Sequence, residues 1–182
     1  QGVRYGGAAD ALRALAERLQ IPVAASASGL GAISSDHPLA VGLVSRGGHY
    51  QANHATRQAD VLLALGVRFD YRTSSSWIPG YSFTIPPTKL IHVDIDPEEI
   101  ARNYPVALGL MADVRTFLRQ VLAELDARKA RAPASRKDWL SAIAGYRKEG
   151  DDFVAPGFTD DTSPINPQRA AYEIDRALPE DA

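Results

Sequence analysis

A chain of 182 residues is long enough for one domain with additional elements, or for two small domains. Hydrophobic residues make up 45% of it and allow a buried core, while a formal net charge of −2 without a basic face argues against a nucleic-acid partner. The absence of cysteine excludes disulfides, thiolate metal sites and cysteine nucleophiles, and it is compatible with the cytoplasm. No apolar run approaches the length of a membrane span.

The first residues predict a glycine-rich turn over 2–7, followed by a helix over 8–19 with one apolar stripe. Such a turn usually follows a strand, and no strand precedes it in the printed sequence. The chain also begins with Gln and ends shortly after a helical pattern. We therefore expect a fragment of a longer protein whose first strand is missing.

The next segments predict strands alternating with helices. Residues 21–25 form a short apolar strand opened by Pro22, and a loop of small residues follows over 26–31. A polar turn over 34–38 and a second glycine loop over 46–50 lead to a helix over 51–58.

The strand predicted over 61–65 organises the chain. Its five consecutive apolar residues are typical of a strand covered on both faces, as in a parallel sheet. It ends at Gly66, and Arg68, Asp70 and Arg72 follow. The carboxyl ends of strands are where ligands bind in open α/β sheets, so these charges either face a crevice there or, as in an ordinary βα loop, simply face water.

After an irregular segment over 71–87, further strands are predicted over 89–95 and 106–110. Asp96, Pro97 and two acidic residues predict a helix start, and Asp113 predicts the cap of a helix running to about residue 130. The alternation predicts an α/β fold with a Rossmann-like, doubly wound, mostly parallel sheet.

The remaining residues predict a helical C-terminal extension. We assign 1–130 to the nucleotide-binding-like domain and 131–164 to a linker that holds a short helix over 137–148 and is extended or disordered over 150–164. Residues 165–182 predict the truncated first helix of a following domain, with Asn166 as its cap and Pro167 at its first position.

Catalytic signatures are absent from this sequence. It contains no P-loop, no G-x-G-x-x-G after a strand and no nucleophile elbow. Its four histidines lack metal-ligand spacing, and His92, in the middle of a predicted strand, is expected to be a packed core residue. The residues alone thus indicate a nucleotide-sized binding module without catalytic or metal-binding residues.

Several segments in a fixed order resemble the central domain of thiamine-diphosphate-dependent enzymes of the acetolactate synthase family. The resemblance covers roughly residues 2–125 and is carried by segments 19–23, 29–31, 58–70, 90–97 and 111–113. Residues 165–182 resemble the first helix of the next domain of such enzymes, which binds the cofactor diphosphate through magnesium.

This resemblance implies decarboxylation and carboligation of 2-keto acids, with thiamine diphosphate and Mg²⁺ bound outside the present residues. The fragment is then inactive alone and belongs to a cytoplasmic homodimer or homotetramer, without a nucleic-acid or membrane partner. Other members of the family, such as glyoxylate carboligases and 2-keto acid decarboxylases, stay open as alternatives.

The resemblance also implies FAD in the central domain, while relatives bind ADP or no nucleotide there. Arg68 would meet the diphosphate, and Asp113 would lie near the adenine or flavin. The loop over 44–48 departs from the FAD-binding pattern because it lacks a histidine. The implied cofactor contacts are Gly2, Ser26, Ala27, Ser28, Gly66, Val67, Arg68, Asp70, Asp94, Ile95, Asp113 and Val114.

Two other functions remain open from the sequence. One is a stand-alone nucleotide-binding module that takes NAD or a flavin. The other is a structural scaffold whose crevice is empty and whose faces join subunits.

Overall fold

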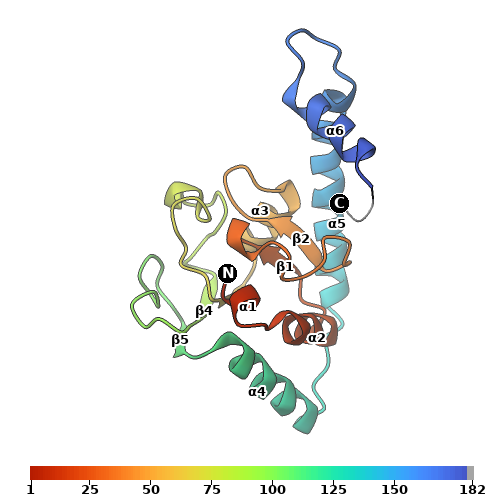
Figure 1. The fold of residues 1–182 in the computed structure, drawn as a ribbon. Coiled ribbons are helices and arrows are strands. Elements are labelled where there is room, and N and C mark those ends of the chain that lie inside the picture. The colour runs from red at the N-terminus through yellow and green to blue at the C-terminus, as the bar shows by residue number, and fades with distance from the viewer. Residues whose placement is uncertain (180–182) are drawn as a thin grey trace.

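The structure is a computed structural model that describes residues 1–179. It alternates strands and helices over its first two thirds and ends in helices (Figure 1). The strands are β1 (Val23–Ala25), β2 (Ala40–Leu43), β3 (Val61–Leu65), β4 (Lys89–Asp94) and β5 (Leu108–Met111). The α-helices are α1 (Gly2–Tyr5), α2 (Ala9–Leu19), α3 (Tyr50–Arg57), α4 (Val114–Ala127), α5 (Arg136–Val154) and α6 (Pro167–Ala177). Short 3₁₀ turns, η1 (Ala27–Gly29), η2 (Ser75–Trp77) and η3 (Ala155–Thr159), complete the elements.

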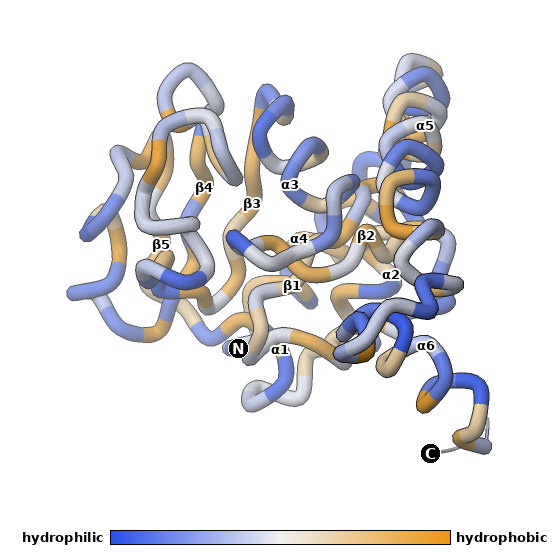
Figure 2. Tube along the Cα trace, turned by 90° about the horizontal axis from the view of Figure 1, so that it is seen from above, coloured by the Kyte–Doolittle hydropathy of each residue, from blue (hydrophilic) through white to orange (hydrophobic). Residues whose placement is uncertain are grey.

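All strand pairs are parallel, as the alternation predicted. β1 pairs with β2, and β4 lies between β3 and β5 in a separate sheet. The pairing of β3 with β4 is regular, from Val61 opposite Lys89 to Leu65 opposite Val93. Across the molecule the strands follow one another from β5 through β4 and β3 to β1 and β2 (Figure 2).

Helices cover both faces of the strands, which confirms the doubly wound α/β fold. On one face, α2 and α4 pack Leu12, Leu15 and Leu118 against Leu63 and Leu65. On the other face, the buried cluster around α3 and α5 includes Ala55, Ile143 and Phe83, and it packs with Leu62 and Ala64. Successive residues of β3 therefore face opposite helix layers, as the pleat of a strand requires.

The structure differs from the sequence analysis in three local features. The glycine-rich turn predicted over 2–7 begins with one helical turn, Gly2–Tyr5, and β2 is a strand that the sequence analysis did not predict. The segment after Asp96 forms turns and no helix, with Ala101 at a φ of 62°. Of the residues between Asp96 and Pro105, only Glu99 is buried, so the segment lacks the apolar stripe that would pack a helix on the core.

The extension is more ordered than expected. Helix α5 runs over 19 residues and η3 continues it to Thr159, so most of the segment over 150–164 is folded and not extended. Ile143 is buried in the core, and Gly150 lies so close to Tyr50 that a Cβ there would be 2.8 Å from the Tyr50 Cβ. Packing on α3 therefore lengthens the helix. The start of α6 is as predicted, since Asn166 Oδ1 accepts from Gln168 N at 2.9 Å.

Within residues 1–179, no helix has the length and apolarity needed to cross a membrane.

Candidate functional site at the carboxyl edge of the sheets

The N-terminal turn crosses the end of β3 at two glycines. Gly2 N donates to Gly66 O at 3.0 Å, and a Cβ on Gly66 would lie 2.5 Å from Gly2 Cα. Gly66 also has a φ of 58°, which favours glycine. The sequence analysis allowed either a sharp turn or close approach of a ligand at Gly66. The crossing with Gly2 accounts for the missing side chain at both positions.

The small-residue loop after β1 lies beside this crossing. Gly29 fits closely against it, because a Cβ there would be 3.2 Å from Ser26 Oγ and 3.4 Å from Gln1 N. Ala27 and Ser28 are exposed within η1. The predicted residues Ser26 and Val67 line one cavity together with Gln1. The structure therefore brings together Gly2, Gly66, Val67 and the loop over 26–28.

Arg68 and Asp70 flank a buried anchor, Phe69. The Phe69 ring is 3% exposed and contacts Phe83 and Tyr104 edge to face, with centroids 5.3 Å away in both cases. Its φ of 51° and the hydrogen bond from Trp77 Nε1 to Phe69 O, at 3.0 Å, fix the backbone there. Arg68 and Asp70 are consequently exposed on either side.

The carboxylate of Asp70 is used within its own turn. Its Oδ1 accepts from Arg72 N at 3.0 Å and from Thr73 N at 2.9 Å, which forms an Asx turn. The Arg68 side chain, by contrast, forms no hydrogen bond or ion pair within residues 1–179. The Arg68 guanidinium is therefore available to bind a ligand, whereas the Asp70 carboxylate primarily stabilises the conformation of its own loop.

Asp94 and Ile95 end the neighbouring strand β4. Asp94 is 7% exposed, and its Oδ1 accepts from Asp96 N at 3.1 Å. Ile95 is 72% exposed, an unusual position for a large apolar side chain at the end of a buried strand. A buried acid next to an exposed apolar residue is an arrangement that can contact the hydroxyls and the ring of a nucleotide.

Asp113 caps α4, as the sequence predicted. Its Oδ1 accepts from Thr116 N at 2.8 Å, and this hydrogen bond holds the pKa of Asp113 below its ordinary value. Its other carboxylate oxygen faces α1, where a Cβ on Gly6 would lie 3.5 Å from Oδ2. Val114 is buried in the core, and a Cβ on Gly2 would lie 3.3 Å from its Cγ2. Both residues thus join α4 to the N-terminal turn.

Two further arginines at this edge were missed by the sequence analysis. Arg4 lies in α1 and Arg46 in the loop that follows β2, and both side chains are exposed. Neither side chain forms a hydrogen bond or ion pair in the described part of the chain. Recognition of β2 would have placed Arg46 at the carboxyl edge, since parallel strands end on the same side.

His92 is a packed core residue, as the sequence predicted. His92 is 1% exposed, and its Nε2 lies 2.9 Å from Val67 O, which makes it a packed core residue below the site. Across the described residues, no three His, Asp or Glu side chains lie close enough together to hold a metal ion.

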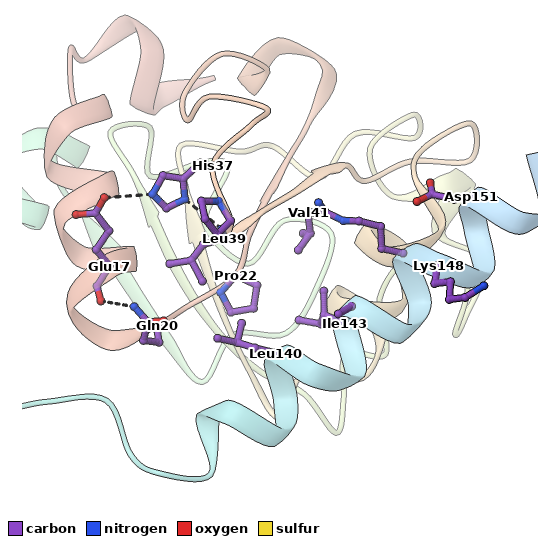
Figure 3. A pocket seen from close by; sticks show the side chains of 13 residues that line it. Glu17, Gln20, Pro22, His37, Leu39, Val41, Leu140, Ile143, Lys148 and Asp151 are labelled. Atoms are coloured by element: carbon purple, nitrogen blue, oxygen red, sulfur yellow. Dashed lines mark hydrogen bonds and ion pairs between the residues drawn. The ribbon is translucent and has the colours of Figure 1, made fainter. Parts of the chain in front are cut away.

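A groove of about 870 Å³ lies at the opposite edge, between α2, α5 and the starts of β1 and β2 (Figure 3). Pro22 and Leu39, which precede β1 and β2, form its floor with Leu140 and Ile143 of α5. On its wall, Glu17 Oε1 pairs with His37 Nε2 at 3.1 Å. None of the site residues predicted from the sequence lines this groove, so it is separate from the candidate site.

Comparison with known families decides the classification of this fold and its edge residues. The family described as "Thiamine pyrophosphate enzyme, central domain" matches residues 1–121. The chain belongs to this family. The match includes every site residue predicted above, and it confirms the resemblance stated from the sequence segments.

Curated relatives of this central domain are acetolactate synthases. The chain is 35% identical over 179 residues to a probable acetolactate synthase large subunit of Methanocaldococcus jannaschii, covering 98% of the chain and 28% of the relative. It is 34% identical over 147 residues to acetolactate synthase isozyme 3 large subunit of Escherichia coli, covering 80% and 25%. It is 32% identical over 166 residues to the chloroplastic acetolactate synthase 1 of Zea mays, covering 91% and 25%. The chain thus spans about a quarter of the length of these relatives.

Proposed function

We propose that this chain is the central domain of an acetolactate-synthase-like enzyme, which uses thiamine diphosphate to decarboxylate and ligate 2-keto acids. We further propose that the carboxyl edge of its strands binds an adenine nucleotide, either FAD or ADP. The nucleotide proposal rests on one observation, that several predicted contacts lie at the same edge of the strands. They are the Gly2–Gly66 crossing, the loop over 26–28, Arg68 and Asp94. The other predicted contacts, from Ile95, Asp113 and Val114, adjoin them.

The residues at this edge fit a dinucleotide chemically. Arg4, Arg46 and Arg68 have exposed guanidinium groups that can pair with a diphosphate. Asp94 can accept from ribose hydroxyls, as acids at strand ends do in dinucleotide-binding folds. A bound FAD or ADP would act here as a structural ligand, which stabilises the folded state by mass action.

On this proposal, thiamine diphosphate, Mg²⁺ and the 2-keto acid pockets belong to other parts of the parent enzyme. On this proposal residues 1–130 form the central domain, and 165–182 begin the next one. The parent enzyme is a cytoplasmic homodimer or homotetramer.

Titration with FAD, ADP and NAD, followed by thermal unfolding, tests the nucleotide proposal. A ligand at 100 times its Kd should add about 2.7 kcal/mol to the free energy of unfolding. Arg68→Ala should weaken FAD or ADP binding about tenfold or more, since a charge-assisted pair to a phosphate is lost. Arg128→Ala removes an exposed guanidinium of the α4 terminus paired with Glu124 and should leave binding unchanged.

The outcomes separate the candidate functions. Binding of FAD or ADP that depends on Arg68 supports the proposal, and a preference for NAD would favour the stand-alone module. If none of FAD, ADP and NAD raises the melting temperature, the result would favour a structural scaffold. Release of carbon dioxide from pyruvate by this chain alone, with thiamine diphosphate and Mg²⁺ added, would contradict the assignment of catalysis to other domains.

A further inference from the structure

The groove at the starts of β1 and β2 (Figure 3) is lined on one side by a single face of α5. The α5 residues that line it recur three or four positions apart, as neighbours on one helix face do. They are Leu140, Ile143, Ala144, Arg147, Lys148 and Asp151. The face is apolar as far as Ala144 and charged from Arg147 onward, so the groove has an apolar part and a charged end.

The floor of the groove is apolar, and its polar backbone groups are already used. Pro22 has no N–H, Leu39 N donates to His37 Nδ1 at 3.1 Å, and Leu39 O accepts from Val23 N at 2.7 Å. Val41 continues the floor toward the charged end. The floor therefore offers contacts to an apolar body and few hydrogen bonds.

The wall formed by α2 and the loop before β2 is negatively charged. Because His37 Nδ1 accepts from Leu39 N, the neutral His37 ring has its proton on Nε2, which donates to Glu17 Oε1 at 3.1 Å. A neutral histidine does not compensate the charge of the Glu17 carboxylate. This wall therefore repels an anionic group.

Arg147, at the charged end, has most of its donors free. Its Nη2 donates to Ala40 O at 2.6 Å, and its side chain forms no other hydrogen bond or ion pair within residues 1–179. The side chain is half-buried and also lines a second cavity of about 330 Å³ beside β2. Most of the guanidinium N–H groups are thus available to a ligand in the groove.

The neighbouring charges leave Arg147 as the group that selects a ligand. Lys148 Nζ donates to Asp152 Oδ2 one helical turn away, so these two charges offset each other. Asp151 is exposed, where solvent screens its charge, and no ion pair in the described part of the chain joins it to Arg147. A half-buried guanidinium with free donors binds a carboxylate well.

We propose that this groove binds a small carboxylate with an apolar body, of the arylalkanoate type. The carboxylate pairs with Arg147, and the body lies on Pro22, Leu39 and Ile143, away from the charge of Glu17. The volume of about 870 Å³ is within the range of pockets that hold small molecules. The proposal is independent of nucleotide binding at the opposite edge and of the activity of the parent enzyme.

Isothermal titration of the chain with 4-phenylbutanoate and with its uncharged amide, 4-phenylbutanamide, tests the head group. The carboxylate should bind about tenfold or more tightly than the amide, because hydrogen bonds to a charged group are the stronger ones. In Arg147→Gln the two compounds should bind equally. The ratio of their dissociation constants does not change if the variant is merely less stable. Failure of the carboxylate to bind, equal binding of both compounds to the wild type, or an unchanged ratio in Arg147→Gln would each overturn the proposal.

Ala144→Phe tests the location of the bound carboxylate. Ala144 is exposed and lines the groove, so a ring there fills the groove without entering the core, and it should weaken binding about tenfold or more. Ser141→Phe adds the same ring at an exposed position of α5 outside the groove and should leave binding unchanged. Unchanged binding in Ala144→Phe, or loss of binding in Arg68→Ala at the opposite edge, would place the carboxylate elsewhere and overturn the proposal.

Discussion

Gly2 and Gly66 are in backbone contact where the first helical turn crosses the end of β3. The hydrogen bond from Gly2 N to Gly66 O, at 3.0 Å, leaves no room for a Cβ on either residue. The crossing therefore fixes the position of α1, and with it the edge that we assign to nucleotide binding.

Gly66→Ala should destabilise the protein strongly. A left-handed backbone costs alanine about 1–2 kcal/mol, and the clash with Gly2 Cα adds to this. Urea unfolding measures the loss. Gly47→Ala, at a position with no atom within 4 Å of the added Cβ, is the matched control and should change the free energy of unfolding little. If Gly66→Ala and Gly47→Ala changed the free energy of unfolding equally, the close backbone contact between Gly2 and Gly66 would be refuted.

Asp113→Ala should lower the melting temperature by about 2–4 °C, because α4 loses its N-cap. Asp113→Asn retains an oxygen that can accept from Thr116 N and should recover most of the loss. The pKa of Asp113 is lowered in the folded state, so its stabilising contribution is present at neutral pH and is lost as pH falls through that lowered pKa. If Asp113→Asn and Asp113→Ala lower the melting temperature equally, the negative charge stabilises the protein at this position and the N-cap hydrogen bond does not.

His54 should make stability depend on pH. Its ring lies between Tyr50 and Tyr146, with centroids at 4.2 and 4.6 Å, and Arg57 Nη2 lies 2.7 Å from Nε2, which must be unprotonated to accept. Burial and then the charge of Arg57 lower the pKa of His54. The unfolded chain therefore binds the proton more readily, and stability should fall as pH decreases from about 7, through the unfolded value of about 6.5, to the lowered pKa of the folded state.

Urea unfolding at several pH values measures this dependence. His54→Phe keeps an aromatic ring between the two tyrosines and should reduce the slope in this pH range. Lys148→Ala changes a charge on α5 without touching His54 and is the control. A slope that is the same in wild type and His54→Phe would assign the pH dependence to other groups.

Ile143→Ala should cost about 2–5 kcal/mol, since the side chain is 5% exposed in the core cluster under α5. Gly145→Ala, two residues away on the open side of the same helix, should instead stabilise by about 0.5–1 kcal/mol. Fluorescence of Trp139, in the first turn of α5, follows the unfolding. A neutral Ile143→Ala would mean that the packing of α5 on the core contributes little to the free energy of unfolding.

Residues whose signal is local could be predicted from the sequence. β3 has the bounds that its five apolar residues predicted, and α6 begins at the predicted Asn166 cap with Pro167 next to it. The capping role of Asp113 was likewise readable from its place before an apolar stripe. These elements are determined by neighbours in the chain, so one sequence is sufficient to recognise them.

Features that depend on distant packing could not be predicted. β2 contains Gly42 at a φ of 89°, which accommodates the ring of His49, and a glycine in four residues obscures a strand signal. Gly150 looked like a linker residue, yet it lets α5 approach Tyr50. The use of Asp70 in an Asx turn, and the free state of Arg46, likewise follow from the folded loops and not from spacing.

The separation of β1 from β3 has a mechanical consequence. Within residues 1–179 no strand hydrogen bonds join β1 to β3, so side chains and the helices packed on both faces connect the two strand groups. The proposed nucleotide contacts lie on both groups, with Ser28 after β1 and Arg68 after β3. A ligand that contacts both residues would therefore connect the two strand groups across their carboxyl edge.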